Sequence, residues 1–283
     1  MSVDPERLVN KILKVAALPK VVLKFNEAIQ NPVTTNHDLE NIISEDTALA
    51  SRLLRIANSA MYNFPSKIET IDKAITIIGH QQMNEIILGC SIIKLFQNIP
   101  QEIVNMEQFW EHSLAVATAS RIIASYRREQ NIEKHFTSGL LHDIGRLIIL
   151  IELPKQTEEI INKARTEDLL LVDVEKGVLG FDHAKLGAML LKKWKLPERL
   201  VSSVYYHHMP NISPGNIVDP AIVHIADIIC HAVQYGSSGE MFVPRLQNKA
   251  WESLNISSDT LPSLMEQLEV QHKEAVKHIL GND

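Results

Sequence analysis

The chain has 283 residues, of which 45% are hydrophobic, and its formal net charge is −6. This length and composition allow one large domain or two modest domains with a substantial core. The acidic excess, with charges of both signs interspersed, argues against general nucleic-acid binding, which favours a basic face.

The first hundred residues predict a series of short helices, separated by proline breaks and by capping residues. The expected helices cover residues 5–16, 20–30, a stretch after Thr34-Thr35-Asn36 that carries Leu39, Ile42 and Ile43, residues 46–58, a stretch from Thr70 or Asp72 to Gly79, and residues 81–97. Arg52 and Arg55 lie on the exposed side of helix 46–58, where we expect a solvated face, with partner binding as the alternative.

The break at Asn98-Ile-Pro100 is the expected boundary between an N-terminal subdomain, 1–100, and a second helical part, 101–283. Apolar spacing in the second part predicts helices over residues 106–128, 136–153, 157–166, 172–179, 183–194, 198–207 and 220–234, followed by one or two capping helices. Strand signals are nearly absent, so the predicted fold is all-α, with an N-terminal helical bundle packed on a second bundle.

The cysteines and the N-terminus predict a compartment. Cys90 and Cys230 lie in apolar, helical-looking stretches outside any C-x-x-C pattern, which indicates buried free thiols in a reducing environment. The N-terminus lacks the apolar core of a signal peptide, and no run approaches the roughly 18 apolar residues of a membrane span. We therefore expect a cytoplasmic protein without membrane contact.

His142 and Asp143 form an adjacent pair inside a segment, Thr137 to Leu150, that is otherwise apolar enough for a core. A buried imidazole and carboxylate lose their hydration, which hydrogen bonds or a metal ion must replace. His112 and Asp227 lie on two other predicted helices in similar surroundings. Two imidazoles and two carboxylates suit a divalent transition metal, such as Fe, Mn, Zn or Ni, better than Ca.

These residues belong to a longer resemblance. His112, the run His-Asp-Ile-Gly-Arg at 142–146, and Asp227 resemble the HD superfamily of metal-dependent phosphohydrolases. Residues 18–210 resemble more closely the HDOD domain, its regulatory relative. The segments that carry this second resemblance are Leu18-Pro19, Leu53 to Ser59, Ala74-Ile75 to Gly79, Gly139 to Gly145, Phe181 to Gly187, Trp194 to Pro197, and His207-His208.

The resemblance implies that the second bundle is of HD type and that the protein acts in bacterial signalling. It also implies one or two metal ions. The first would be bound by His112, His142, Asp143 and Asp227, and the second by His183, His207 and His208, as in the related HD-GYP phosphodiesterases. If the chain is catalytic, metal-assisted phosphoester hydrolysis would use Asp143, and Arg146 could hold a phosphate by paired hydrogen bonds.

Three positions depart from the pattern of the relatives. No Gly-Tyr-Pro follows His208, Arg146 stands where a lysine is expected after His-Asp-Ile-Gly, and Gln108 stands where a trinuclear site would have a glutamate. The first and third departures argue against hydrolysis of cyclic dinucleotides.

The resemblance therefore predicts first a regulatory module that holds metal in its HD half and acts through a signalling protein or a phosphorylated or nucleotide ligand. An active metal-dependent phosphohydrolase or phosphodiesterase is the alternative, and a nucleotide-binding sensor without turnover is a third reading. Several residues keep simpler explanations. His207-His208 could cap a helix C-terminus, Arg146 could be an ion-pairing residue, and we expect His224 and His231 to be core groups or to support the ligands.

Overall fold

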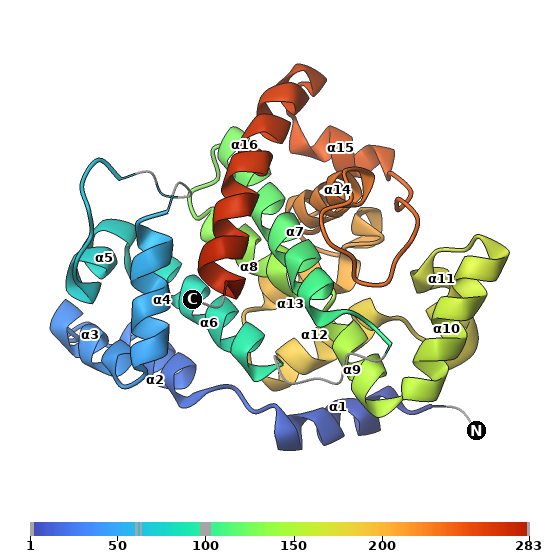
Figure 1. The fold of residues 1–283 in the computed structure, drawn as a ribbon, viewed down its shortest axis with the longest axis horizontal. Coiled ribbons are helices and arrows are strands. Elements are labelled where there is room, and N and C mark those ends of the chain that lie inside the picture. Colours follow the sequence, from blue (N-terminus) through green and yellow to red (C-terminus); the bar gives the residue numbers. More distant parts are fainter. Residues whose placement is uncertain (1–2, 60–61, 63, 97–102, 282–283) are drawn as a thin grey trace.

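The structure is a computed structural model that describes residues 3–281 apart from 60–61, 63 and 97–102. No strand occurs among these residues, so the predicted all-α fold is confirmed (Figure 1). The N-terminal helices are α1 (Pro5–Val15), α2 (Lys20–Ala28), α3 (Asn36–Ser44), α4 (Thr47–Ala57), α5 (Ile71–Ile78) and α6 (His80–Leu95). The expected boundary at 98–100 lies outside the described residues.

The remaining helices follow in chain order. They are α7 (Met106–Tyr126), α8 (Glu133–Leu141), α9 (Ile144–Glu152), α10 (Pro154–Glu167), α11 (Leu171–Leu179), α12 (His183–Lys193), α13 (Glu198–Tyr206), α14 (Val218–Ala232), α15 (Asn248–Leu254) and α16 (Leu261–Ala275). Three short non-α helices, η1 (Pro210–Ile212), η2 (Ser258–Thr260) and η3 (Val276–Leu280), complete the described elements.

Side-chain caps explain where several N-terminal helices begin. Thr35 accepts a hydrogen bond from the backbone N–H of Asp38 at the start of α3, and Asp46 accepts one from Leu49 at the start of α4. The Thr70 side chain caps α5 in the same way. These caps satisfy backbone donors that a helix leaves unpaired, so the predicted starts of all three helices agree with the structure.

The single helix expected over residues 136–153 is wrong, because the chain breaks at the His-Asp pair. Helix α8 ends at Leu141 and α9 begins at Ile144, which leaves His142 and Asp143 in the turn between them. Just after the break, a Cβ on Gly145 would lie 1.9 Å from the carbonyl oxygen of His183, so this position has room only for glycine. The start of α9 therefore packs directly against the start of α12, and Arg146 lies on α9 rather than on the helix before His142.

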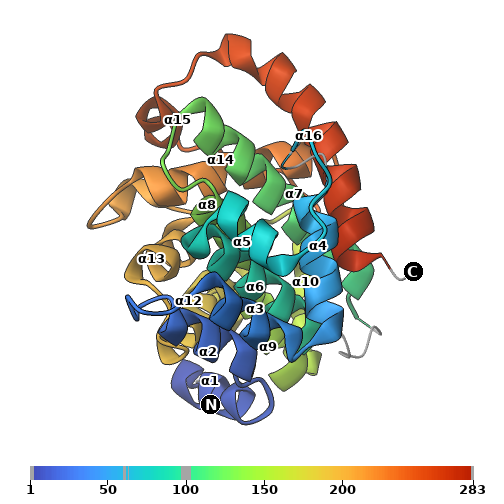
Figure 2. The same ribbon diagram turned by 90° about the vertical axis from the view of Figure 1, so that its left-hand side faces the viewer.

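The N-terminal helices α2–α5 lie at one end of the molecule, and α10 and α11 lie at the other (Figure 1). Figure 2 views the molecule from the end that carries α2–α5. Helix α1 runs along the second bundle and contacts α9 and α12. The indole of Trp194 donates a hydrogen bond to the Ala16 carbonyl, which links the end of α12 to the end of α1. One large apolar core extends through both halves, from Leu8 to Ile279.

Helix α7 lies between this large core and a smaller one that it forms with α14, α15 and α16. It is buried almost all round, with Leu114 and Ala117 in the large core and Val116 and Ile123 in the small one. Polar side chains on such a helix face the protein interior. Cys90 and Cys230 are buried free thiols, as predicted. Within the described residues, no helix combines the length and apolar character of a membrane span.

Candidate metal centre

The seven predicted metal ligands come together at the centre of the second bundle. Helix α7 provides one of them, the α8–α9 turn two, the first residue of α12 one, the end of α13 two, and α14 one. In that order, they are His112, His142, Asp143, His183, His207, His208 and Asp227. All except His208 are at most 3% exposed. Such a concentration of buried imidazoles and carboxylates needs compensation from within the cluster.

The first group surrounds the Asp227 carboxylate. Its Oδ1 lies 3.3 Å from Nε2 of His112 and 3.6 Å from Nε2 of His142. The Nε2 atom of His142 is also 3.4 Å from Oδ2 of Asp143. These ligand atoms are buried and have no hydrogen-bond partner among the described residues. A cation at their centre would satisfy them together.

The tautomers of the histidines are set by their other ring nitrogen. The Nδ1 atom donates to a carbonyl oxygen in three of them, at 3.3 Å from His112 to Tyr235, 2.7 Å from His142 to Gly139, and 2.7 Å from His207 to Val204. A carbonyl only accepts, so the Nδ1 atoms carry the protons. In the neutral rings the Nε2 lone pairs therefore point into the cluster, which is the arrangement of metal-binding histidines.

The second group brings three imidazoles to one point. The Nε2 atom of His183 lies 2.9 Å from Nε2 of His208 and 3.4 Å from Nε2 of His207. A hydrogen bond between two ring nitrogens needs a proton on one of them, so either one Nε2–H donates to the lone pair of its neighbour or a cation bridges the nitrogens. The Asp143 Oδ1 atom is 3.0 Å from the same Nε2 of His183. Asp143 thus lies between the two groups, with one oxygen toward each.

The electrostatics of the cluster favour charged carboxylates and divide the ligand histidines. Burial alone would lower the pKa of His142 and His183, but the carboxylates of Asp143 and Glu175 outweigh it and raise these pKa values to about 10 and about 9. Burial alone would raise the pKa of Asp227, but three neighbouring imidazoles hold it well below its usual range. Burial would also raise the pKa of Asp143, and the nearby Arg146 and histidines lower it well below its usual range. Burial and the charges of neighbouring imidazoles lower the pKa of His207 to about 3. Anionic oxygens and a neutral nitrogen donor are the forms that bind metal.

His231 joins the cluster, although the sequence indicated only a core or supporting role. Its Nδ1 lies 3.0 Å from the carbonyl oxygen of Asp227 and 2.9 Å from the Oδ1 of that residue. Its Nε2 is buried without a partner, and His112, Asp227 and His231 present ligand atoms close enough for one ion. The spacing of four residues along α14 is the signal that pointed to this shared face. His231 therefore belongs to the candidate centre.

Two further residues support the ligands from outside the cluster. Glu175 on α11 accepts hydrogen bonds from Nδ1 of His183, at 2.6 Å, and from its backbone N–H, at 2.8 Å. His224 on α14 donates to the backbone oxygen of His207 at 2.8 Å. His207 follows directly after α13 and its ring points into the cluster. Its position at the helix end is therefore compatible with its role as a candidate ligand. Nothing in the sequence near Glu175 indicated its role.

Arg146 lies beside the ligands. Its Nε is 3.2 Å from Oδ1 of Asp143, and its Nη1 donates to the backbone oxygen of Ser238 at 3.4 Å. Burial would lower the pKa of Arg146, but the charge of Asp143 and other carboxylates raises it, so the side chain stays cationic. The structure thus favours the ion-pairing role for Arg146. Gln108 is exposed and hydrogen-bonded to Glu111, away from the cluster.

The segment 234–247 covers the cluster between α14 and α15. Its Tyr235 carbonyl holds His112, and its Ser237 N–H donates to the Gln108 carbonyl at 2.9 Å. Gly236 has φ +66°, and a Cβ there would meet the backbone N of His112 at 2.3 Å, so only glycine allows this close approach. Glu240 then accepts the Leu171 N–H at 2.7 Å, which fastens the segment to α11.

Comparisons with known proteins agree with this fold. A protein of unknown function from Geobacter sulfurreducens, described as an HDOD domain protein, has a TM-score of 0.80 at 23% identity, with 96% of this chain and 97% of that one covered. Two candidate phosphohydrolases from Shewanella amazonensis SB2B, the second described as metal-dependent, have TM-scores of 0.72 and 0.68 at 24% and 19% identity. Both alignments cover 97% of this chain, and 97% and 99% of the other. At these identities the likeness shows the fold alone.

A curated protein of Treponema pallidum (strain Nichols), itself uncharacterized, is 24% identical over 204 residues. The match covers 71% of this chain but only 39% of that protein, so the chain spans about two fifths of its relative. The HDOD domain family matches residues 15–210, which is well over half of the chain. The chain therefore belongs to the HDOD domain family.

Proposed function

We propose that this protein is a metal-dependent phosphoester hydrolase with a two-metal centre. The observation that carries the proposal is the position of Asp143 between the two groups of ligand atoms, with both its oxygens unpartnered, Oδ2 near His142 and Oδ1 near His183. A carboxylate shared by two ions is a common feature of sites that hold two metals for phosphoryl chemistry. The geometry therefore supports the enzymatic alternative over a purely regulatory module.

The residues fit divalent transition metals. His112, His142, Asp143 and Asp227 would hold one ion, and Asp143, His183, His207 and His208 a second. This mixture of imidazole nitrogen and carboxylate oxygen suits Fe, Mn, Zn or Ni. Bound there, the ions would polarise a phosphoryl oxygen and lower the pKa of water.

The other residues of the site would orient the ligands and limit access by solvent. Carbonyl oxygens and Glu175 fix the tautomers of the ligand histidines, and Arg146 adds a positive charge beside Asp143. The segment 234–247 closes one side, while His208 and His231 are the partly exposed members of the cluster. The Shewanella amazonensis proteins described as candidate phosphohydrolases, with the same fold, support the proposal.

Metal analysis and phosphodiester hydrolysis test the proposal together. The protein loaded with Fe, Mn, Zn or Ni in turn should hold two ions per chain and hydrolyse a generic phosphodiester. His112→Gln and His207→Gln should each lose one ion, because each change affects a different group of ligands. Cyclic dinucleotides serve as a second substrate class. A metal-replete protein that contains no ion, or that holds two ions and hydrolyses no phosphoester, would contradict the proposal.

A second candidate function is regulation through a partner, which a groove in the N-terminal bundle favours. The groove has a volume of about 770 Å³ and lies between α4, the loop 64–69 and His278 near the C-terminus. Leu54 and Phe64 give it apolar surface, and Arg55 and Lys67 give it positive charge. A partner that binds here should be released by Lys67→Glu and retained by Asp143→Ala. The reverse pattern would contradict this second function.

A further inference from the structure

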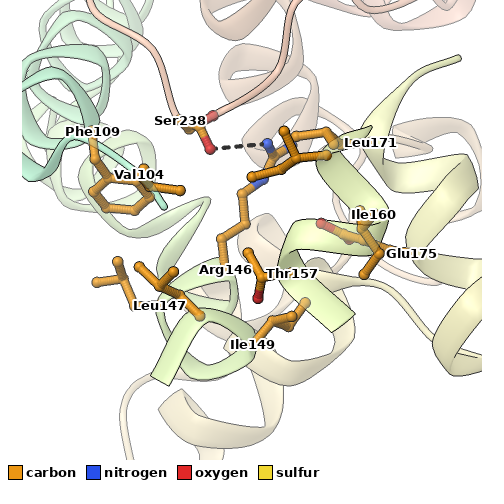
Figure 3. A pocket seen from close by; sticks show the side chains of 12 residues that line it. Val104, Phe109, Arg146, Leu147, Ile149, Thr157, Ile160, Leu171, Glu175 and Ser238 are labelled. Carbon is orange, nitrogen blue, oxygen red and sulfur yellow. Dashed lines mark hydrogen bonds between the residues drawn. The ribbon is translucent and has the colours of Figure 1, made fainter. Parts of the chain in front are cut away.

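A narrow apolar slot lies beside the metal centre (Figure 3). Its walls come from α7, α9, α10, α11 and the residues next to them, and include Phe109, Leu147, Ile160 and Leu171. The cavity has a volume of about 30 Å³. This is room for about two water molecules, so only a slim group fits without displacing the walls.

One end of the slot is polar and contacts the metal ligands. Arg146 and Glu175 both line the slot, and they lie 3.2 Å from Asp143 and 2.6 Å from His183, respectively. Figure 3 shows the Arg146 side chain crossing the slot toward Ser238. Arg146 and Glu175 therefore lie between the slot and the candidate metal centre and contact both.

Two polar atoms at this end have no hydrogen-bond partner among the described residues. They are Nε of Arg146 and Oγ of Ser238, on side chains that are 8% and 3% exposed as whole residues. A buried guanidinium has five donors, and beyond the ion pair of its Nε with Asp143 this one makes a single long hydrogen bond, of 3.4 Å, within the described residues. Unused donors beside an apolar cavity suit a ligand with an anionic head and an apolar tail.

We propose that the slot binds the alkyl group of a small alkyl phosphate, with the phosphate at Arg146 and toward the metal ligands. The proposal rests on the proposed function, whose substrate class it names. Hydrolysis of such an ester forms a bond from water oxygen to phosphorus and breaks the bond from phosphorus to the alcohol oxygen. The products are an alcohol, which takes one proton of the water, and inorganic phosphate.

The polar groups of the slot argue against a nucleobase as its occupant. The Thr157 hydroxyl already donates to the Leu153 carbonyl at 3.1 Å, and Glu175 is engaged by His183. A base would bury several donors and acceptors against apolar walls without partners, which is unfavourable. A slim alkyl chain has no such requirement, and it gains from each methylene that it buries.

A series of alkylphosphonates tests the slot, because their carbon–phosphorus bond resists hydrolysis. The full chain loaded with metal is titrated by calorimetry with inorganic phosphate and with methyl-, ethyl-, propyl- and butylphosphonate. The Kd should fall by about fourfold per added carbon until the slot is full. A Kd that is independent of chain length would overturn the slot while leaving the metal centre intact.

Variants locate the effect. Ile160→Ala enlarges the slot and should shift the best ligand to a longer chain, whereas Thr157→Leu narrows it and should favour a shorter one. Ile122→Ala, in the smaller core, is the matched control and should change no preference. Equal effects of Ile160→Ala and Ile122→Ala would contradict the proposal. If the protein holds metal but binds no inorganic phosphate, the proposed function fails together with the slot. If it binds phosphate but its Kd for the alkylphosphonates is independent of chain length, only the slot fails.

Discussion

The N-terminal bundle and the metal centre satisfy their polar groups in opposite ways. In α3, Thr35 and Asp38 satisfy each other's backbone N–H groups over three residues of sequence. In the centre, His112 faces Asp227, from a distant part of the chain, and both retain unpartnered buried atoms. The partners of a local cap meet as the helix forms, whereas the residues of the centre meet only after the whole bundle has folded, and their unpartnered atoms would be satisfied by a cation.

This difference predicts that the two regions respond separately to substitution. Loss of a ligand should remove metal and activity, because several helices contribute to one ion. Loss of an apolar or capping residue in the N-terminal bundle should lower stability and leave the metal content of the folded protein unchanged. Three substitutions test this separation and a fourth, at His135, tests a buried histidine outside the cluster; they follow in decreasing order of expected effect.

Asp143→Asn should have the largest effect, because this carboxylate lies between both ligand groups. We expect both ions to be lost and phosphoester turnover, if present, to fall by at least about a thousandfold. Element analysis and a hydrolysis assay measure the two effects, and circular dichroism checks that the helices remain. Asp72→Asn, in α5, is the control and should keep both ions. If the Asp143→Asn protein retains two ions, Asp143 is not a ligand shared by both.

Phe25→Ala should destabilise the protein without affecting the metal. Phe25 on α2 is fully buried, so its truncation leaves a cavity and should cost about 3–5 kcal/mol in the free energy of unfolding. Urea denaturation measures the change. Leu23→Ala, on the same helix at 53% exposure, should change stability by less than about 0.5 kcal/mol. If the folded Phe25→Ala protein loses metal, the two regions are coupled more closely than their contacts indicate.

Local sequence predicted most of the fold because local interactions set most of the helix ends. Thr35 and Thr70 were recognisable as caps, Asp46 was the expected start of the next helix, and each precedes a helix in the structure. The break at His142–Asp143 was missed because the surrounding residues, taken alone, favour a continuous helix. It accompanies the contact of Gly145 with the His183 backbone, which a pattern within one segment cannot contain.

The candidate site shows the same limit. The seven residues named from the resemblance do converge, whereas His231 was expected only as a core or supporting group, although its spacing to Asp227 along α14 indicated a shared face. Glu175 had the pattern of an ordinary helical acid. Its position beside His183 depends on the turn through Gly180, where the left-handed backbone (φ +83°) ends α11 and redirects the chain into α12.

His135 tests whether an unpartnered histidine outside the cluster behaves as an ordinary buried group. Both its ring nitrogens lack hydrogen bonds, and burial, with the charge of Lys134, lowers its pKa from 6.5 to about 3. Between these pH values the unfolded state binds a proton that the folded state does not. Above pH 6.5 the His135 ring is neutral in both states, so the folded state is then most favoured. Below pH 6.5 the free energy of unfolding should fall by about 1.4 kcal/mol per pH unit.

Urea denaturation between pH 7 and pH 4 measures this slope. His135→Leu should reduce it, because the substituted side chain takes up no proton in either state. His37→Leu, at an exposed position in α3, is the control and should leave the slope unchanged. Parallel pH profiles for the wild type and His135→Leu would show that other groups account for the acid sensitivity.

Thr35→Ala should have the smallest effect and the most local one. It removes the side chain that accepts the Asp38 N–H at 3.2 Å, so α3 loses its cap at a cost of about 1 kcal/mol. The adjacent Thr34→Ala is the matched control, since the α3 cap uses Thr35. Metal content and affinity should be unchanged in both, because no ligand lies on α3. A change in metal affinity with Thr35→Ala would mean that the folding of the N-terminal bundle and metal binding at the centre are coupled. The two regions would then not respond separately, even to the mildest of these substitutions.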